Sequence, residues 1–272
     1  MGGAEKLGVK ESYSGYGAEQ GMQGLREKIS EVLYEGRIKP EEVFVSDGAK
    51  CDIQRLQNMF GPTVKSAVQD PSYPVYVDTS VMMGQTGELD EATSQYKDIV
   101  YMPCTAENGF YPDIAKSPRA DVVYICSPNN PTGVAATRKQ LEETVRICKE
   151  RGSILVFDAA YAPFIRSPGV PKSIFEIEGA RDVAIEVNSF SKYAGFTGVR
   201  LGWTVIPEDL KVRACSSSRC WPLRCATRAP RCSSCSASLA ARIQTHPHTR
   251  ANAVLRWNPR SPGLQPRHDY VL

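Results

Sequence analysis

Three short runs of β-branched and apolar residues limit the fold of this chain more than any other feature of its sequence. They span residues 121–126, 153–157 and 182–187. A strand buried on both faces, as in a parallel sheet covered by helices, reads as such a continuous run. Leu141 and Val145 lie between the first two runs at helical spacing. Because strands alternate with helices, we predict an α/β fold with three α/β/α layers and a mostly parallel sheet.

The rest of the first 210 residues continues this alternation of helix and strand patterns. Apolar side chains recur at helical spacing in the predicted helices, for example Leu25 with Ile29 and Ile53 with Leu56. We expect further helices from about residue 22, after residue 50 and over residues 77–84, and further strands over residues 41–46, 63–68 and 99–102.

Charge divides the chain into two parts. The 272 residues have a net charge of +3. Residues 211–272 hold Lys211 and ten arginines against a single acid, Asp269, whereas residues 1–210 hold more acidic than basic side chains. We therefore place a domain boundary at residue 210 and expect residues 1–210 to form the folded domain.

Residues 211–272 are rich in Arg, Cys, Ser and Pro and have no sustained apolar period. Such a segment cannot bury enough apolar surface to form a core, so we predict that it is disordered or translated out of frame. Cys232 and Cys235, with His246 and His248, do not have the spacing of a standard zinc finger. The arginines are not interleaved with aromatic residues, so we expect no nucleic acid as a partner.

The cysteines indicate a protein of a reducing compartment, and the hydropathy pattern indicates no membrane-spanning segment. Four cysteines, Cys51, Cys104, Cys126 and Cys148, are scattered through the first 210 residues without a pairing pattern. No apolar run approaches the length of about 20 residues that spans a membrane, so we expect no membrane partner. The first residues have neither an apolar signal core nor a transit-peptide composition.

Residues 188–203 gather hydroxyl, amine and guanidinium groups directly after the third run. Within them, Lys192 follows Ser191 and could react as an amine. A lysine forms a Schiff base with an aldehyde when its neighbours and its burial lower its pKa. Ser189, Ser191 and Arg200 suit a phosphate monoester, the arginine through a bidentate fork. A reactive amine beside a phosphate cradle predicts a pyridoxal phosphate site, although a solvated loop with an ordinary lysine is the simpler interpretation of this segment alone.

Five other side chains at the ends of predicted strands favour the cofactor site. Asp158 and Tyr161 follow the second run, and Asn130 lies between prolines after the first. Lys50 and Tyr73 follow two earlier strands. Open α/β sheets bind ligands at the carboxyl ends of their strands, so we expect these side chains to share one edge of the sheet with the lysine.

Each residue then has a task in cofactor chemistry. Lys192 holds the cofactor covalently and, once an amino acid displaces it, moves the proton at the substrate Cα. Asp158 keeps the pyridine nitrogen protonated, so that the ring can act as an electron sink. Asn130 and Tyr161 can donate hydrogen bonds to the phenolic oxygen, and Tyr73 can stack on the ring.

The phosphate would lie at the start of the helix after residue 48. Unpaired backbone N–H groups and the helix dipole favour an anion there, so Ala49 and Lys50 are the predicted backbone ligands. Ser189, Ser191 and Arg200 complete the predicted cradle. No step needs a metal, and we predict no metal site.

Several of these motifs resemble those of fold-type I pyridoxal-phosphate-dependent aminotransferases of class I/II. The motifs are Asn129-Asn130-Pro131-Thr132-Gly133, Asp158-x-x-Tyr161, and Ser189-x-Ser191-Lys192 with Arg200. Residues 16–21, 47–53, 70–78 and 189–203 resemble in particular the LL-diaminopimelate aminotransferase family. The resemblance covers about residues 9–210 and implies the large domain of fold type I.

The resemblance implies reversible amino transfer from L-glutamate to tetrahydrodipicolinate in lysine synthesis, giving LL-diaminopimelate and 2-oxoglutarate. It implies a homodimer in which Tyr13 reaches the neighbouring site, with Lys50, Tyr73 and Asn130 near the substrate. In plants and algae it implies the chloroplast, and otherwise the cytoplasm. The family also has a small C-terminal domain, whose arginine binds the substrate carboxylate, and we expect that domain to be missing here.

Other interpretations stay open at this point. The chain could be another fold-type I enzyme, such as a different aminotransferase or an aminocyclopropane carboxylate synthase. It could also be an inactive cofactor domain that only dimerises. A third interpretation, a binding protein that acts through its basic tail, rests on residues 211–272 alone.

Overall fold

The computed structural model describes residues 17–210, so the predicted tail over residues 211–272 and Tyr13 lie outside the described residues. Seven of the described strands form one sheet in the order β1-β9-β8-β7-β6-β2-β5, which confirms the predicted α/β fold. Their bounds are β1 Val43–Ser46, β2 Ser66–Asp70, β5 Val100–Pro103, β6 Val122–Cys126, β7 Ile154–Asp158, β8 Ala184–Ser189 and β9 Gly202–Val205. Two further short strands, β3 Leu89–Asp90 and β4 Gln95–Tyr96, pair with each other as a separate hairpin.

Five α-helices alternate with the strands in the described part of the chain. They are α2 Gln23–Lys28, α3 Ala49–Phe60, α4 Val75–Met82, α5 Arg138–Arg151 and α6 Phe190–Tyr193. A π-helical turn, Ile29–Leu33, continues α2, and 3₁₀ turns span Pro40–Glu42, Ala106–Asn108, Ala162–Phe164, Ile174–Glu176 and Ala180–Asp182.

The sheet is parallel except for one strand. β2, β5, β6, β7 and β8 pair in parallel, and β9 pairs antiparallel with both β8 and β1. Since β1 and β8 are both antiparallel to β9, they run in the same direction. The carboxyl ends of β1, β2, β6, β7 and β8 therefore lie at one edge of the sheet.

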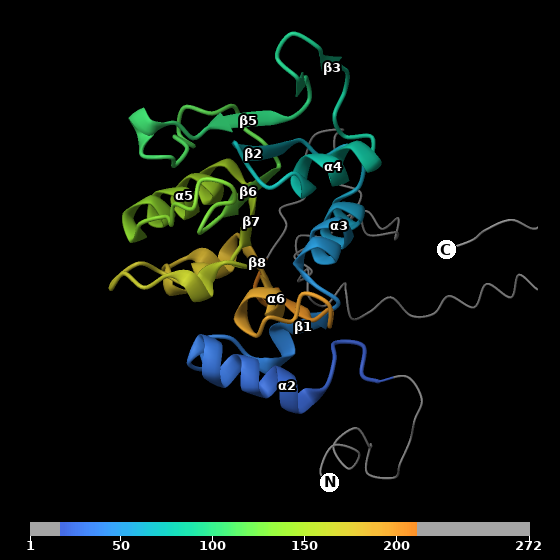
Figure 1. The fold of residues 1–272 in the computed structure, drawn as a ribbon, viewed down its shortest axis with the longest axis vertical. Helices are drawn as coiled ribbons and strands as arrows, with labels where there is room; N and C mark the ends of the chain where they lie inside the picture. Colours follow the sequence, from blue (N-terminus) through green and yellow to red (C-terminus); the bar gives the residue numbers. More distant parts are fainter. Residues whose placement is uncertain (1–16, 211–272) are drawn as a thin grey trace, which may run out of the picture.

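Helices cover both faces of this sheet, with α5 on one side and α3 and α4 on the other (Figure 1). Alternate residues of each strand serve the two cores, since successive side chains of a strand point to opposite faces. Leu155 and Phe157 pack in the core that contains Leu141 of α5. Ile154 and Val156 pack in the core that contains Ile53 of α3. This alternation decides which side of the sheet each polar residue faces.

Local sequence signals explain both ends of α5 and the start of α3. At the start of α5, the Thr137 hydroxyl accepts from the Gln140 N–H at 3.3 Å, and the Gln140 side chain accepts from the Thr137 N–H at 2.8 Å. This capping box satisfies N–H groups that have no partner inside the helix. Gly152 ends the helix in the left-handed conformation at φ 63°, which glycine adopts without strain. At the other helix, Gly48 precedes α3 with φ 130°.

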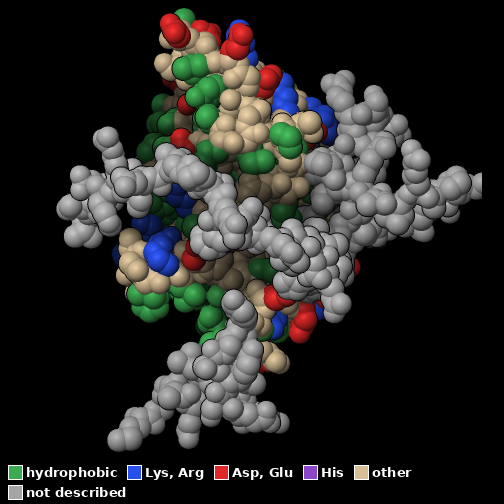
Figure 2. Space-filling view, turned by 90° about the vertical axis from the view of Figure 1, so that its right-hand side faces the viewer, with side chains coloured by type: hydrophobic (Ala, Val, Ile, Leu, Met, Phe, Trp, Pro, Cys, Tyr) green, Lys and Arg blue, Asp and Glu red, His purple; other side chains and the backbone are tan. Residues whose placement is uncertain are grey.

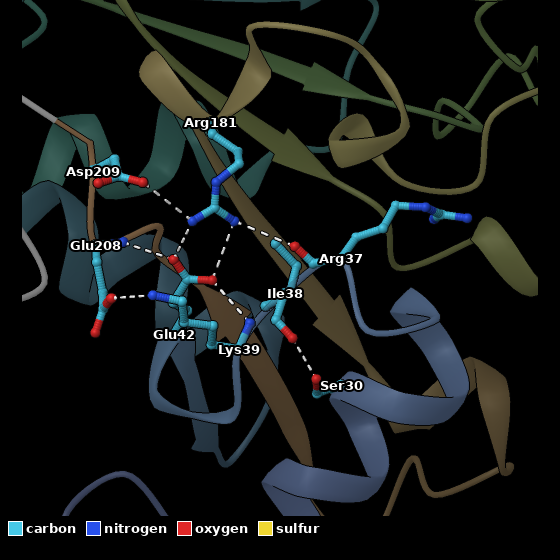
Figure 3. Close-up of polar contacts among 8 residues, drawn as sticks. All are labelled: Ser30, Arg37, Ile38, Lys39, Glu42, Arg181, Glu208 and Asp209. Carbon is cyan, nitrogen blue, oxygen red and sulfur yellow. Dashed lines mark hydrogen bonds and ion pairs between the residues drawn. The ribbon is translucent and has the colours of Figure 1, made fainter.

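An ion pair between a buried glutamate and a partly exposed arginine lies beside β1 (Figure 3). Glu42 has 0% exposure and contacts the Arg181 guanidinium at 2.5 and 3.2 Å. The backbone N–H groups of Lys39 and Glu208 also donate to the Glu42 carboxylate, both at 2.9 Å. Burial opposes the charge of Glu42, but these donors hold the pKa of its carboxyl below the usual value.

Figure 2 shows the molecule from the side on which α3 and α4 lie. Acidic and basic side chains gather at the end of the molecule near β3 and β4, with hydrophobic side chains between charged ones. Val81 and Met82 of α4 and Leu89 of β3 are exposed apolar residues.

Some predicted boundaries need correction. The strand predicted over residues 41–46 begins at Val43, because the residues before it form a 3₁₀ turn. The strand predicted over residues 63–68 is Ser66–Asp70, three residues later at its start. The helix predicted over residues 77–84 is Val75–Met82.

Candidate active site

Asp158 is a buried carboxylate at the carboxyl end of β7, with 3% exposure. Its Oδ2 accepts a hydrogen bond from the Tyr76 hydroxyl at 2.8 Å, and its Oδ1 accepts from the Ala160 N–H at 3.0 Å. Burial raises the pKa of Asp158, and these two donors offset part of that rise. A carboxylate in such surroundings gains most from a cation brought into contact with it.

Lys192 is exposed on α6, and its Nζ lies 5.1 Å from the centre of the Tyr161 ring. An ammonium group over an aromatic face at this distance is attracted by the ring. The helix beneath the lysine is held by aromatic packing, because the rings of Phe190 and Tyr193 lie 4.6 and 5.5 Å from the Trp203 ring. The amine is therefore on an anchored helix and open to solvent.

Glu186 lies on β8, and its carboxylate accepts hydrogen bonds from three different segments of the chain. It accepts from the Tyr34 hydroxyl at 2.8 Å, the Ser173 hydroxyl at 2.7 Å and the Asn188 amide at 2.8 Å. Burial raises the pKa of Glu186 to about 6 in spite of these donors. Ser189 ends the same strand, and its Oγ accepts from the Ser191 N–H at 3.2 Å, which caps α6.

Arg200 and Gly48 form a close contact at the N-terminus of α3. A Cβ atom on Gly48 would lie 2.6 Å from Arg200 Nη2, so a side chain there would displace the end of the arginine from its present position. A Cβ on Gly202 would lie 2.8 Å from both the Asn188 carbonyl oxygen and the Gly48 Cα. The guanidinium also donates to the Thr197 carbonyl oxygen at 2.8 Å. Positive charge and the first N–H groups of a twelve-residue helix thus meet at one point, which suits an anion.

Asp52 fixes the start of α3 against the sheet. Its Oδ2 accepts from the Ser46 hydroxyl of β1 at 2.6 Å and from the Thr204 hydroxyl of β9 at 2.9 Å. Burial raises the pKa of Asp52, and hydrogen bonds from Ser46, Thr204 and Arg55 oppose that rise. These hydrogen bonds attach the N-terminus of α3, where Gly48 meets Arg200, to the strands β1 and β9.

The loop after β6 is held in place by Asn129. Its Nδ2 donates to the Pro71 carbonyl oxygen and to the Thr132 hydroxyl, both at 3.1 Å. Asn129 is 3% exposed, and its Oδ1 is buried without a hydrogen-bond partner among the described residues. Asn130 is half-buried next to it. The pattern of the sequence singled out Asn130, and no signal distinguished the structural role of Asn129.

Tyr73 and Lys50 lie at the same edge on other elements. Tyr73 is half-buried, and its ring meets the Tyr76 ring edge-on with centres 6.1 Å apart. Burial raises the pKa of Tyr73, and the charge of Asp158 adds to that rise. Lys50 is exposed in the first turn of α3.

A hollow of about 560 Å³ lies between the loop after β6 and the segment after β7, and neither Asp158 nor Lys192 is among the residues that line it. Asn130 and Tyr161 line one part of it, and Phe164 and Arg166 line another. Its volume lies in the range of about 300–1,000 Å³ that is usual for small-molecule sites. Phe164 and Arg166 had no sequence signal that would have marked them.

The pattern that describes class I and II aminotransferases matches residues 3–254 of the chain. The chain belongs to the aminotransferase class I and II family. The predicted resemblance to this family is thereby confirmed, and the matched range includes every predicted site residue from Tyr13 to Arg200.

Curated members of the family are similar over three quarters of the chain. The LL-diaminopimelate aminotransferase of Protochlamydia amoebophila is 57% identical over 208 residues, which are 76% of this chain and 51% of that protein. The chloroplastic LL-diaminopimelate aminotransferase of Arabidopsis thaliana is 60% identical over 208 residues, 76% of this chain and 45% of that protein. The chain thus spans about half the length of the curated relatives it matches.

A solved structure of the same family has the same fold. It is the L,L-diaminopimelate aminotransferase of Chlamydomonas reinhardtii, which is 57% identical, with a TM-score of 0.70 over 76% of this chain and 51% of that one. The predicted resemblance to the LL-diaminopimelate aminotransferases is therefore confirmed.

In this aminotransferase-family chain, the predicted residues within the described range fall into four groups. Asp158 ends β7 and Tyr161 follows it; Ser189 ends β8, and Ser191 and Lys192 follow it; Arg200 meets the start of α3, where Ala49 and Lys50 lie. Tyr73 and Asn130 follow β2 and β6. Tyr13, predicted to serve the neighbouring subunit, lies outside the described residues.

Residues 17–210 contain neither a metal-binding cluster of side chains nor a membrane-spanning helix. Within that range, no group of His, Cys, Asp and Glu side chains is arranged to hold a metal ion. In the same range, no helix is both long and apolar enough to cross a membrane.

Proposed function

We propose that this chain carries the pyridoxal phosphate site of an LL-diaminopimelate aminotransferase. The reaction would move an amino group reversibly from L-glutamate to tetrahydrodipicolinate, giving LL-2,6-diaminopimelate and 2-oxoglutarate. One observation supports it most: a buried carboxylate, Asp158, ends its strand at the edge that also holds the exposed amine of Lys192 and the cradle of Arg200 and Gly48. The names of the curated relatives support the choice of substrate.

The side chains and backbone at this edge fit the proposed cofactor. Phosphate would bind at the N-terminus of α3, where Arg200 meets Gly48, with Ser189 at the end of β8 and Ser191 in α6 as further ligands. Asp158 offers a buried negative charge to the pyridine nitrogen. When bound, pyridoxal phosphate supplies an electron sink for the charge that develops at the substrate Cα.

Each remaining task belongs to a residue of the chain. Lys192 attaches the cofactor and then carries a proton to and from the substrate Cα as a general base and acid. Asp158 holds the proton on the pyridine nitrogen by its charge. Tyr161 and Asn130 orient the phenolic oxygen by hydrogen bonding, and Tyr73 covers the ring.

The proposal extends to assembly and location. We propose a homodimer in which Tyr13 of each chain contributes to the neighbouring site, and in which Lys50 lies near the substrate. For a plant or algal source we propose the chloroplast, supported by the chloroplastic relatives, and for a bacterial source the cytoplasm.

The first test is the visible absorbance of the purified chain with pyridoxal phosphate. We expect a band from cofactor bound to Lys192, and a loss of that band when LL-diaminopimelate is added and its amino group moves to the cofactor. Borohydride should fix the cofactor to the chain permanently. The variant Lys192→Ala should capture none, whereas Lys172→Ala, which changes an exposed lysine outside the site, should capture the parental amount.

Three outcomes would count against parts of the proposal. Equal borohydride trapping in Lys192→Ala would refute the assigned lysine. A band that responds to another amino acid, or to S-adenosylmethionine, but not to LL-diaminopimelate would indicate a different fold-type I enzyme. A band that responds to no substrate would indicate a cofactor domain without turnover.

A further inference from the structure

Tyr76 contacts Asp158 from α4. It lies within the family motif of residues 70–78, but the sequence assigned a task there to Tyr73 alone. Its hydroxyl donates to Asp158 Oδ2 at 2.8 Å, and the residue is 1% exposed. Among the residues from 17 to 210, Tyr76 is the only side chain that donates a hydrogen bond to this carboxylate. The second oxygen, Oδ1, receives the Ala160 N–H.

The surroundings of Tyr76 fix its ring in one position. The ring stacks on that of Tyr124 with centres 5.0 Å apart and an interplanar angle of 20°. The backbone oxygen of Tyr76 accepts from the Ser80 hydroxyl at 2.9 Å and from the Gln57 amide at 3.3 Å. On its other side the ring meets Tyr73 edge-on. The hydroxyl is therefore aimed at Asp158 before any ligand arrives, so that binding needs no reorganisation of this donor.

We propose that Tyr76 is a positioning residue that orients the Asp158 carboxylate toward the ring nitrogen of the cofactor and holds the carboxylate in its ionised form. The inference rests on the proposed function, because it assigns to Tyr76 an effect on the ring nitrogen of pyridoxal phosphate. It adds a residue on α4 to a site that the sequence motifs place on loops after the strands.

The chemistry of the two groups favours this role. Burial and the nearby charge of Asp158 raise the pKa of the Tyr76 hydroxyl far above its ordinary value, so the hydroxyl keeps its proton and acts only as a donor toward the carboxylate. A donor stabilises the ionised carboxylate more than the neutral acid. Each carboxylate oxygen can accept a further hydrogen bond, so both oxygens still have a free lone pair for a cation. Within residues 17–210, the charge of Asp158 also raises the pKa of Tyr73 and of Cys126, and neither of these groups carries a positive charge.

The test compares two ligands that differ only at the ring nitrogen. One is pyridoxal phosphate, and the other is 1-deazapyridoxal phosphate, in which a CH group replaces the nitrogen. Dissociation constants of both are measured at neutral pH for the parental chain, for Tyr76→Phe and for Tyr111→Phe. Tyr111 is a matched control, because its buried hydroxyl bonds to Thr144 at 2.7 Å and does not contact Asp158.

We expect the parental chain to prefer pyridoxal phosphate over the analogue. Tyr76→Phe should reduce this preference about tenfold, which is the usual worth of a hydrogen bond to a charged group. Tyr111→Phe should keep it. A loss of general packing would weaken both ligands alike and leave the preference unchanged, and that result would overturn the role of Tyr76. No preference in the parental chain would instead overturn the role of Asp158 in the proposed function.

A second measurement needs no ligand. The pH titration of the Asp158 carboxyl carbon, followed by ¹³C NMR and assigned with Asp158→Asn, should give a higher pKa in Tyr76→Phe than in the parental chain. If Tyr76→Phe fails to fold, 3-fluorotyrosine at position 76 keeps the ring and makes the hydroxyl a stronger donor, so the pKa of Asp158 should then fall. An unchanged pKa in either variant would refute the inference.

Discussion

Gly48 has no Cβ atom, and this matters both for the backbone conformation before α3 and for the position of Arg200. Its φ of 130° and ψ of 156° lie in a region of backbone conformation that is essentially reserved for glycine. The Arg200 guanidinium occupies the space that a Cβ would fill.

We expect Gly48→Ala to lower the free energy of unfolding by about 1–3 kcal/mol, because a side chain is strained in this conformation. It should also weaken binding of pyridoxal phosphate, since Arg200 would have to move. Thermal unfolding and a ligand titration check both effects. Gly24→Ala is the control, because Gly24 lies inside α2 with no atom near its Cβ position, and alanine should be neutral or stabilising there. Equal behaviour of the two variants would contradict the prediction.

Some single residues of the site were predictable and others were not. Asp158, Lys192 and Arg200 follow strands that the apolar pattern locates, so their position at one edge follows from the α/β fold. Tyr76 lies in a motif whose sequence assigned a task to Tyr73 alone, and Glu186 lies inside a strand outside the quoted motifs. Their partners are up to 152 residues away in the sequence, as for Tyr34 with Glu186, so only the three-dimensional structure identifies them.

At the scale of elements, the ion pair of Glu42 and Arg181 joins the turn before β1 to the turn before β8. We expect Glu42→Gln to destabilise the fold by about 3 kcal/mol, because the removal of one partner leaves Arg181 without its buried counter-charge. Urea unfolding at neutral pH measures this loss. A cost equal to that of Glu31→Gln, which removes an exposed ion pair with Lys28, would contradict it.

The pH dependence of this element follows from the lowered pKa of Glu42. A carboxyl whose pKa is lower in the folded state stabilises the fold above its ordinary pKa of 4.5, and that contribution is lost as the pH falls through the folded value. The parental chain should therefore lose more stability on acidification than Glu42→Gln does.

Glu186 of β8 makes folding stability depend on pH in the opposite direction. Its pKa is raised from 4.5 to about 6, so its contribution to stability is complete below pH 4.5 and is lost as the pH rises through about 6. The shift corresponds to about 2 kcal/mol. Glu186→Gln should remove this part of the pH profile of unfolding, whereas Glu178→Gln, at an exposed position, should keep it. An unchanged profile in Glu186→Gln would refute the assignment.

The elements themselves were predictable where both faces of a strand are apolar. The patterns locate β6 and β7 to within about two residues, because burial on both sides leaves little choice of side chain. β9 was not predicted, since Gly202–Val205 lies in a stretch whose glycines and arginine indicate a loop. The hairpin of β3 and β4 was missed as well, because two-residue strands have no period to detect.

At the scale of the whole molecule, the described sheet has a core on each face. Within the described range of residues 17–210, both cores consist of residues between Ile29 and Leu210. Because residues 211–272 have no sustained apolar period, we expect that a chain ending at residue 210 will fold in the same yield and with the same melting temperature as the full chain. Circular dichroism and a thermal melt of the two proteins check this. A large loss of solubility or of melting temperature would show that residues 211–272 belong to the folded domain.

The alternation of side chains along β7 also restricts how such a site can change over evolutionary time. Ile154, Val156 and Asp158 face the α3 side by virtue of their even spacing, with Leu155 and Phe157 on the other side. The gain or loss of one residue within this strand would turn the carboxylate toward α5 and put a phenyl ring in its place. Mutations that alter chain length can therefore accumulate in the connections between elements, while β7 can vary only by substitution.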